Sequence, residues 1–268
     1  VKYGIPFVPT FLITWLFQSF DKLALRNYCD FTEIGLYSAA FKVVAIMNLI
    51  QAGFTTFWVP ISYESYEQNS EDKGIFEKTS LFIAAAMFML GMGILLFKDV
   101  IFLLLARSYR TAAQISPFLI LMSIMGTVEY VTGQGINFKK KTYWHIVRSL
   151  VAAIIDIVGN LLFVPIYGAK GAAFTTGISY IVFFSISTYI SQKLYKVNYH
   201  LGKFYSATII FVIVAFINTF VDILSVQIVS AIIGFILITI IYKDQIKYAI
   251  SLIINELKGI KKKATNKA

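Results

Sequence analysis

Eight long apolar runs constrain this chain more than any other feature of its sequence. Each run is 18 residues or longer, and together they cover 7–26, 34–61, 79–97, 112–136, 144–166, 171–192, 204–221 and 225–242. Runs of this length favour membrane helices over buried strands, because a helix needs ~20 mostly apolar residues to cross a bilayer. The sequence therefore predicts an all-α integral membrane protein with about eight transmembrane helices.

The composition excludes several other classes of protein. Hydrophobic residues make up 58% of the 268 residues and charged residues only 14%, whereas a soluble domain has about 45–50% and 25%. A secreted disulfide scaffold, a disordered chain and an ordinary cytosolic enzyme are therefore excluded. The single Cys29 allows neither an intrachain disulfide nor a zinc cluster, and His145 and His200 lie far apart in the sequence. Because nucleotide-binding, metalloprotease and serine-hydrolase motifs are also absent, we expect no enzyme activity, no cofactor and no metal site.

The net charge of +10 is explained by membrane topology. In a soluble protein such an excess would suggest nucleic acid as a partner. Here most lysines fall in connections on the same side as the two chain ends, and the opposite connections contain only Lys98, Arg107, Arg110 and Lys170. Positively charged connections stay in the cytoplasm. The sequence therefore predicts that both ends are cytoplasmic and gives no reason to expect nucleic acid.

Four basic residues lie within or at the edge of the apolar runs, and they are the candidate substrate-binding residues. Lys42 lies about eight residues into its run, ~12 Å along a helix, where a lysine costs ~2.5–3.5 kcal/mol unless it is paired or hydrated. Snorkelling to the nearer interface is the alternative for Lys42, and interfacial anchoring is the alternative for Arg26. Lys22 and Arg148 complete the set. Ammonium and guanidinium groups suit a phosphate ligand.

Acidic residues accompany these bases at membrane depth. Asp156 lies near the middle of its run, and two interpretations of it remain open: a proton-titrating or cation-binding group in transport, or a structural partner of Arg148 or Lys42. Asp21 is expected to pair with a cation on another helix. Asp21 and Asp156 are thus candidates for charge balance or ion coupling. Glu129 is a weaker candidate, for which helix packing is the better explanation.

Three stretches of the chain resemble one known family. Residues 2–25, KYGIPFVPTFLITWLFQSFDKLAL, resemble the proline-containing helix with a D-K/R pair that begins the second half of bacterial polysaccharide flippases. Residues 31–50, FTEIGLYSAAFKVVAIMNLI, are similar to the helix that follows. Residues 156–180, DIVGNLLFVPIYGAKGAAFTTGISY, resemble the N-x-x-x-x-P-x-x-G-x-x-G-A-A hairpin of that family. The resemblance is to the C-terminal half of an O-antigen-type flippase of the multidrug/oligosaccharidyl-lipid/polysaccharide exporter superfamily.

The resemblance implies an architecture and a function. Members of this superfamily have two six-helix lobes that face a central cavity, often with two extra C-terminal helices. Residues 1–192 would form the second lobe, 193–242 two additional helices and 243–268 a basic cytoplasmic tail, and a preceding lobe is expected as the missing partner. The implied function is translocation of undecaprenyl-pyrophosphate-linked oligosaccharide across the bacterial cytoplasmic membrane for surface polysaccharide synthesis, including lipopolysaccharide. By resemblance, Lys22 and Lys42 lie on cavity-lining helices.

The resemblance also implies partners, and the residues leave rival functions open. Lipid-linked oligosaccharide and membrane lipid are the expected ligands, with a polysaccharide polymerase and a chain-length regulator as expected protein partners. A drug or cation exporter of the same superfamily would favour embedded acids over bases. A membrane-embedded glycan polymerase would need a large outer loop, but the longest polar stretch, 64–78, maps to the cytoplasm. A purely structural membrane subunit would not explain the buried charges.

Overall fold

A computed structural model describes residues 7–251, and this part of the chain is entirely helical between its turns. The predicted all-α fold is thereby confirmed. The elements are α1 (Phe7–Tyr28), α2 (Phe31–Gln68), α3 (Gly74–Leu103), the 3-10 helix η1 (Arg107–Gln114), α4 (Ser116–Thr132), α5 (Gln134–Phe138), α6 (Tyr143–Leu194), α7 (Leu201–Phe220) and α8 (Leu224–Ile241).

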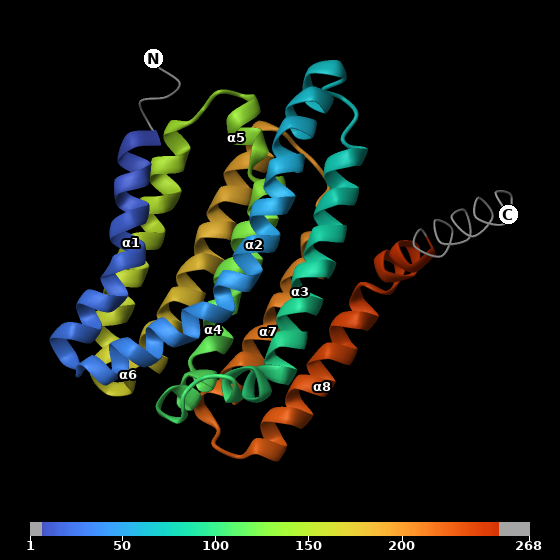
Figure 1. Cartoon of the computed structure of the whole chain (residues 1–268). Coiled ribbons are helices and arrows are strands. Elements are labelled where there is room, and N and C mark those ends of the chain that lie inside the picture. The colour runs from blue at the N-terminus through green and yellow to red at the C-terminus, as the bar shows by residue number, and fades with distance from the viewer. Residues whose placement is uncertain (1–6, 252–268) are drawn as a thin grey trace, which may run out of the picture.

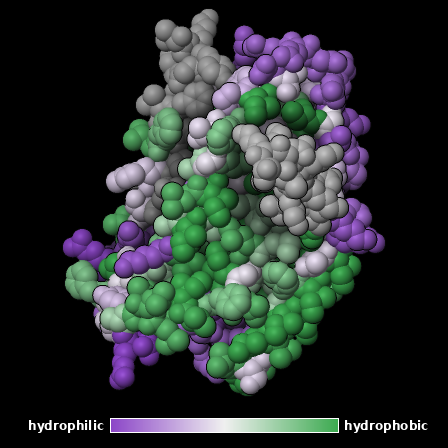
Figure 2. Space-filling model, turned by 45° about the vertical axis from the view of Figure 1, so that its right-hand side comes forward, coloured by the Kyte–Doolittle hydropathy of each residue, from purple (hydrophilic) through white to green (hydrophobic). Residues whose placement is uncertain are grey.

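The long helices run alternately in opposite directions, so their connections gather at two ends of the bundle (Figure 1). The connections 69–73, 139–142 and 195–200 lie at the upper end of Figure 1, and η1 and the connection 221–223 lie at the lower end. The lysine-rich connections identified from the sequence therefore share one end, while Arg107, Arg110 and Lys170 lie at the other. Between the ends, apolar side chains cover much of the face in Figure 2.

Five helices of the described part are long and apolar enough to cross a membrane, namely α2, α3, α6, α7 and α8. A sixth crossing is formed if η1 and α4, which meet at 57°, are counted as one bent span. α1 is not among them, because its second half carries Asp21, Lys22 and Arg26. The exact number of eight spans therefore stays a prediction.

The core of the bundle is built around α4. Nearly all residues of α4 are buried, and it packs against α2, α3, α6 and α7. α8 packs against α3 and α7, so the two helices after α6 belong to the same bundle as those before it. The predicted tail, 243–268, is described only as far as residue 251, and its remainder lies outside the described residues.

The longest polar stretch, 64–78, is mostly helical. α2 continues to Gln68 and α3 begins at Gly74, leaving only 69–73 as the connection. At the other end of α2, the side chain of Asp30 caps the helix by accepting hydrogen bonds from the backbone N–H groups of Thr32 and Glu33, at 3.0 and 3.1 Å. The polar ends of both helices extend beyond their apolar middles.

α6 is a helical hairpin whose turn lies at Gly168. This residue has φ +56° and ψ −134°, in a region open essentially to glycine alone. The arms 143–167 and 169–194 then pack so closely that a Cβ on Gly159 would lie 2.4 Å from Thr175. Glu33 of α2 closes the turn, because its Oε2 accepts a hydrogen bond from the backbone N–H of Ala169 at 2.7 Å. The two arms of the hairpin therefore pack closely against each other.

Gly168→Ala should destabilise the protein by roughly 2 to 3 kcal/mol. The new Cβ would need a strained backbone and would lie 2.6 Å from Glu33 Oε2, in the path of the hydrogen bond to Ala169. Thermal unfolding in detergent measures the change. Gly53→Ala is the matched control, since a Cβ there meets nothing within 4 Å and alanine is the better helix former. Equal effects of the two substitutions would contradict the strained turn.

Candidate functional site

A cavity of about 650 Å³ opens between α1, α2, α4, α5 and the two arms of α6. Placing polar groups in the middle of an apolar bundle costs free energy. A cavity lined by several of them is therefore a candidate binding site. Its polar lining includes amide, charged and imidazole side chains, those of Asn48, Gln51, Glu129, Gln134, Asn137, His145 and Arg148. One predicted site residue, Arg148, thus lines this cavity.

Arg148, on the first arm of α6, is held by contacts from two other helical segments. Its Nη1 donates hydrogen bonds to the carboxylate of Glu129 on α4 and to Ser187 Oγ on the second arm of α6, the latter at 2.6 Å. Ser187 Oγ in turn donates to Glu129 Oε1 at 2.5 Å, and the guanidinium lies 4.6 Å from the ring centre of Phe183. The side chain of Arg148 is 12% exposed. Arg148 and Glu129 therefore form a compensated ion pair on the cavity wall.

A chain of amide groups continues the cavity wall from α5. His145 Nε2 lies 2.7 Å from Asn137 Oδ1, and Asn137 Nδ2 donates to Gln134 Oε1 at 2.9 Å. Across the cavity, Asn48 of α2 accepts a hydrogen bond from Ser123 Oγ at 3.0 Å. Each amide side chain has a carbonyl oxygen that accepts hydrogen bonds and an NH2 group that donates them. The wall therefore offers both donors and acceptors to a ligand.

The two predicted acids, Asp21 and Asp156, lie together in a separate buried cluster. Asn160 Nδ2 bridges them, donating to Asp21 Oδ1 at 2.8 Å and to Asp156 Oδ2 at 3.1 Å. Asp21 also accepts hydrogen bonds from Thr176 Oγ1, at 3.1 Å, and from the hydroxyl of Tyr37. We call these five residues the acidic cluster. It joins α1, α2 and both arms of α6.

The acidic cluster contains no basic side chain. Asp156 and Asn160 are fully buried, and each has one side-chain oxygen, Oδ1, without a hydrogen-bond partner among the described residues. Two carboxylates in a site of low dielectric constant repel each other, so a proton or a cation bound between them would stabilise the cluster. The arrangement is therefore suited to holding a proton or a cation between the two acids.

The structure corrects the partners predicted for these acids. No ion pair in the described part of the chain joins Asp156 to Arg148 or Lys42, and Asp21 is hydrogen-bonded by neutral groups. The interpretation of Asp156 as the partner of Arg148 or Lys42 is wrong, because Glu129 of α4 lies nearer to the guanidinium. The signal was available in the sequence: Glu129 and Arg148 are an acid and a base at membrane depth in successive apolar runs.

The other three predicted bases lie on the surface of the bundle. Lys22 and Arg26 of α1 and Lys42 of α2 are exposed, and none of them forms a hydrogen bond or ion pair with a side chain that the structure describes. Large apolar side chains of the same two helices are also exposed, including Trp15 at 65% and Leu49 at 74%. The exposed face of α1 and α2 thus combines free cations with apolar surface.

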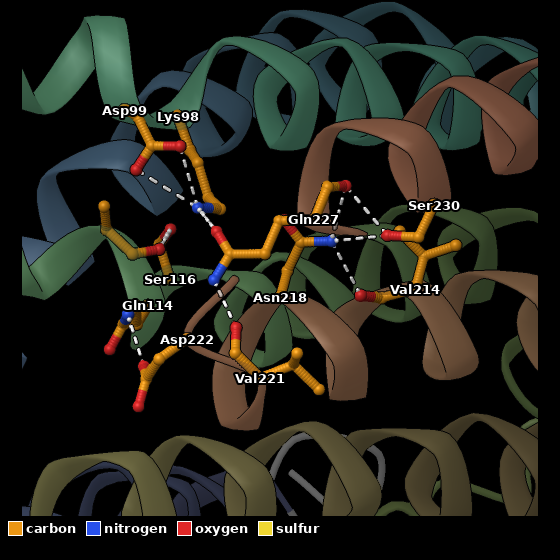
Figure 3. A network of polar contacts seen from close by, with 11 residues as sticks. Lys98, Asp99, Gln114, Ser116, Val214, Asn218, Val221, Asp222, Gln227 and Ser230 are labelled. Carbon is orange, nitrogen blue, oxygen red and sulfur yellow. Dashed lines mark hydrogen bonds and ion pairs between the residues drawn. The ribbon is translucent and has the colours of Figure 1, made fainter. Parts of the chain in front are cut away.

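The sequence did not predict the role of Lys98, which is buried at the lower end of the bundle. Figure 3 shows its ammonium between Asp99 and Gln227, with Nζ donating to Gln227 Oε1 at 2.8 Å and to Asp99 Oδ2 at 3.0 Å. Gln227 Nε2 donates to the carbonyl of Val221 at 2.6 Å, so the network ties α3 to the α7–α8 hairpin (Figure 3). A glutamine within the otherwise apolar run 225–242 was the available signal.

Comparison with known proteins adds no assignment: the chain matches no protein-family model, no curated protein and no solved structure. Within the described residues, no group of three or more His, Cys, Asp or Glu side chains could hold a metal ion.

Proposed function

We propose that this chain is the second lobe of a flippase that moves undecaprenyl-pyrophosphate-linked oligosaccharide from the cytoplasmic to the outer leaflet of a bacterial cytoplasmic membrane. The observation that carries the proposal is the polar cavity of about 650 Å³ within a bundle of apolar helices. A lipid-linked glycan needs a hydrophilic compartment for its sugar while its tail stays in lipid. The three stretches that resemble polysaccharide flippases support the same function.

In the proposed mechanism, the glycan and the pyrophosphate use different parts of the lobe. Sugar hydroxyls would bind the amides of the cavity wall and the Arg148–Glu129 pair, which offer donors and acceptors without net charge. The pyrophosphate would bind the free cations Lys22, Arg26 and Lys42 on the exposed face of α1 and α2. A preceding lobe would face these helices and complete the cavity, and alternating access would rock one lobe against the other.

The acidic cluster would couple this movement to an ion gradient. A proton or a cation between Asp21 and Asp156 would change the packing of α1 against both arms of α6, which share the cluster. The lysine-rich end of the bundle would face the cytoplasm, together with both chain ends.

Lys42→Ala, made in the complete gene of the bacterium that encodes the protein, tests the proposal. Loss of the pyrophosphate contact should abolish surface polysaccharide and leave lipid-linked oligosaccharide on the cytoplasmic side, at normal protein abundance. Lys196→Ala, which removes an exposed lysine from the connection after α6, is the control and should leave surface polysaccharide at its normal level. A normal level of surface polysaccharide in the Lys42 variant would contradict the assignment of Lys42 to pyrophosphate binding.

Export of a drug or cation by the same architecture is the second candidate function. The observation that favours it is the acidic cluster, in which two carboxylates lie without a basic partner. Vesicles containing the complete protein separate the two candidates. Translocation of a lipid-linked oligosaccharide supports the flippase, and uptake of a small cationic dye in its place supports the exporter.

A further inference from the structure

A second cavity, of about 560 Å³, lies on the outside of the bundle along α3. α3 provides most of its lining, Phe54 of α2 contributes one side, and the helical segment 243–251 that follows α8 contributes the other. The segment contacts α3 beside the cavity, where the rings of Phe82 and Tyr248 lie 5.4 Å apart. We call this cavity the outer groove.

The lining of the outer groove is apolar except at one end. Ala85, Ala86 and Met89 line its inner part, and Lys78, Thr79 and Gln245 are its polar side chains. From Lys78 to Met89 the helix rises ~16 Å, about half of the ~30 Å hydrocarbon core of a bilayer. The groove therefore has the depth of one leaflet, with its polar end beside the lysine-rich end of the bundle.

The charge around the polar end favours an anion. Lys78 is exposed there, and the segment 243–251 carries Lys243 and Lys247 against a single acid, Asp244. The Oε1 atom of Gln245 is buried and has no hydrogen-bond partner within the described residues, so it can accept a hydrogen bond from a hydroxyl group. A ligand with an apolar chain, a negative charge and a hydroxyl donor fits this combination.

We propose that the outer groove binds one acyl chain of an anionic glycerophospholipid of the membrane, with its phosphate on Lys78. α2 and α3, which form two of its walls, are long and apolar enough to cross a membrane, so the surroundings of the apolar part of the groove are lipid chains rather than water. A second copy of this chain is a less suitable occupant, because docking face to face would bring the lysines of both copies together and they would repel each other. Basic pockets at the cytoplasmic ends of membrane helices are suited to anionic lipid head groups. The inference does not depend on the flippase proposal.

Native mass spectrometry of the full chain tests this site, after exposure to an equimolar mixture of phosphatidylglycerol and phosphatidylcholine in detergent. The wild type should retain one phosphatidylglycerol in preference to phosphatidylcholine. Lys78→Gln should reduce that preference roughly fivefold, the worth of one lysine near an anionic head group. Lys196→Gln, an exposed lysine away from the groove, should leave the preference unchanged.

Filling the groove gives an independent measurement. Ala86→Trp should remove the retained lipid, because Ala86 lines the groove and is exposed. Gly93→Trp is the matched control, two turns further along the same face of α3, where a Cβ meets nothing within 4 Å. Thermal unfolding of both variants checks that each is folded. Unchanged phosphatidylglycerol retention in folded Ala86→Trp, equal retention of the two lipids by the wild type, or displacement only by an undecaprenyl phosphate would each overturn the proposal.

Discussion

Arg148→Met should destabilise the protein by about 3–5 kcal/mol, the cost of leaving one partner of a buried ion pair uncompensated. The substitution removes the guanidinium and leaves the carboxylate of Glu129, 9% exposed, with Ser187 as its remaining hydrogen-bond donor. Methionine keeps the apolar stem of the side chain but not the guanidinium that lies on Phe183, and most of the loss comes from the charge. Unfolding of the purified protein in detergent measures this change.

The double substitution Arg148→Met/Glu129→Met should recover most of that loss. With both charges absent, no ion remains to be desolvated, and replacing a buried pair by apolar residues is often neutral or stabilising. The two single variants and the double variant form a thermodynamic cycle, and its interaction energy reports the coupling of the pair. A double variant as unstable as Arg148→Met would show that the pair is not the source of the destabilisation.

Asp156→Asn should have the opposite profile, with a large effect on transport and a small effect on stability. Asparagine keeps the shape of the side chain and removes one of two neighbouring carboxylates, so the free energy of unfolding should change by less than about 1 kcal/mol. In vesicles containing the complete protein, transport should no longer respond to an imposed proton or cation gradient. Asp21→Asn should give the same loss, because Asn160 bridges both acids.

Asp222→Asn is the control for this experiment. Asp222 is an acid at the lower end of the bundle, 77% exposed, where it accepts a hydrogen bond from Gln114 at 2.9 Å. Its substitution should leave the gradient response intact. A normal response in the Asp156 and Asp21 variants would mean that the acidic cluster has a structural role only, while the flippase proposal itself would still rest on the polar cavity.

The fold was predictable because its signals are local. Apolar runs of sufficient length gave the helices, and the short interval between the runs 144–166 and 171–192 gave the hairpin. Its turn lies at Gly168, in a conformation that only glycine tolerates. The extent of α2 was not predictable in the same way. Its last residues, up to Gln68, are polar, and hydropathy cannot distinguish a helix that continues into water from a loop.

The candidate site was only partly predictable, because its contacts join residues distant in the sequence. Hydropathy identified Asp21 and Asp156 as charges at membrane depth, but 139 positions separate Asp21 from Asn160, which bridges the two acids. Arg148 was assigned to ligand binding and Glu129 to helix packing, whereas the two form one pair. Lys98 directly follows the apolar run 79–97, which is the pattern of a lysine at the membrane interface. In the structure it is buried and hydrogen-bonded to Gln227.

The Lys98–Gln227 contact has a consequence for the order in which the protein is built. The two residues are 129 positions apart, and chains are synthesised from the N-terminus at roughly 5–20 residues per second. α3 therefore emerges many seconds before its glutamine partner exists. Until α8 arrives, the ammonium of Lys98 has to stay in contact with water or lipid head groups. α8 is thus the helix that seals the lower end of α3 (Figure 1), a helix made much earlier.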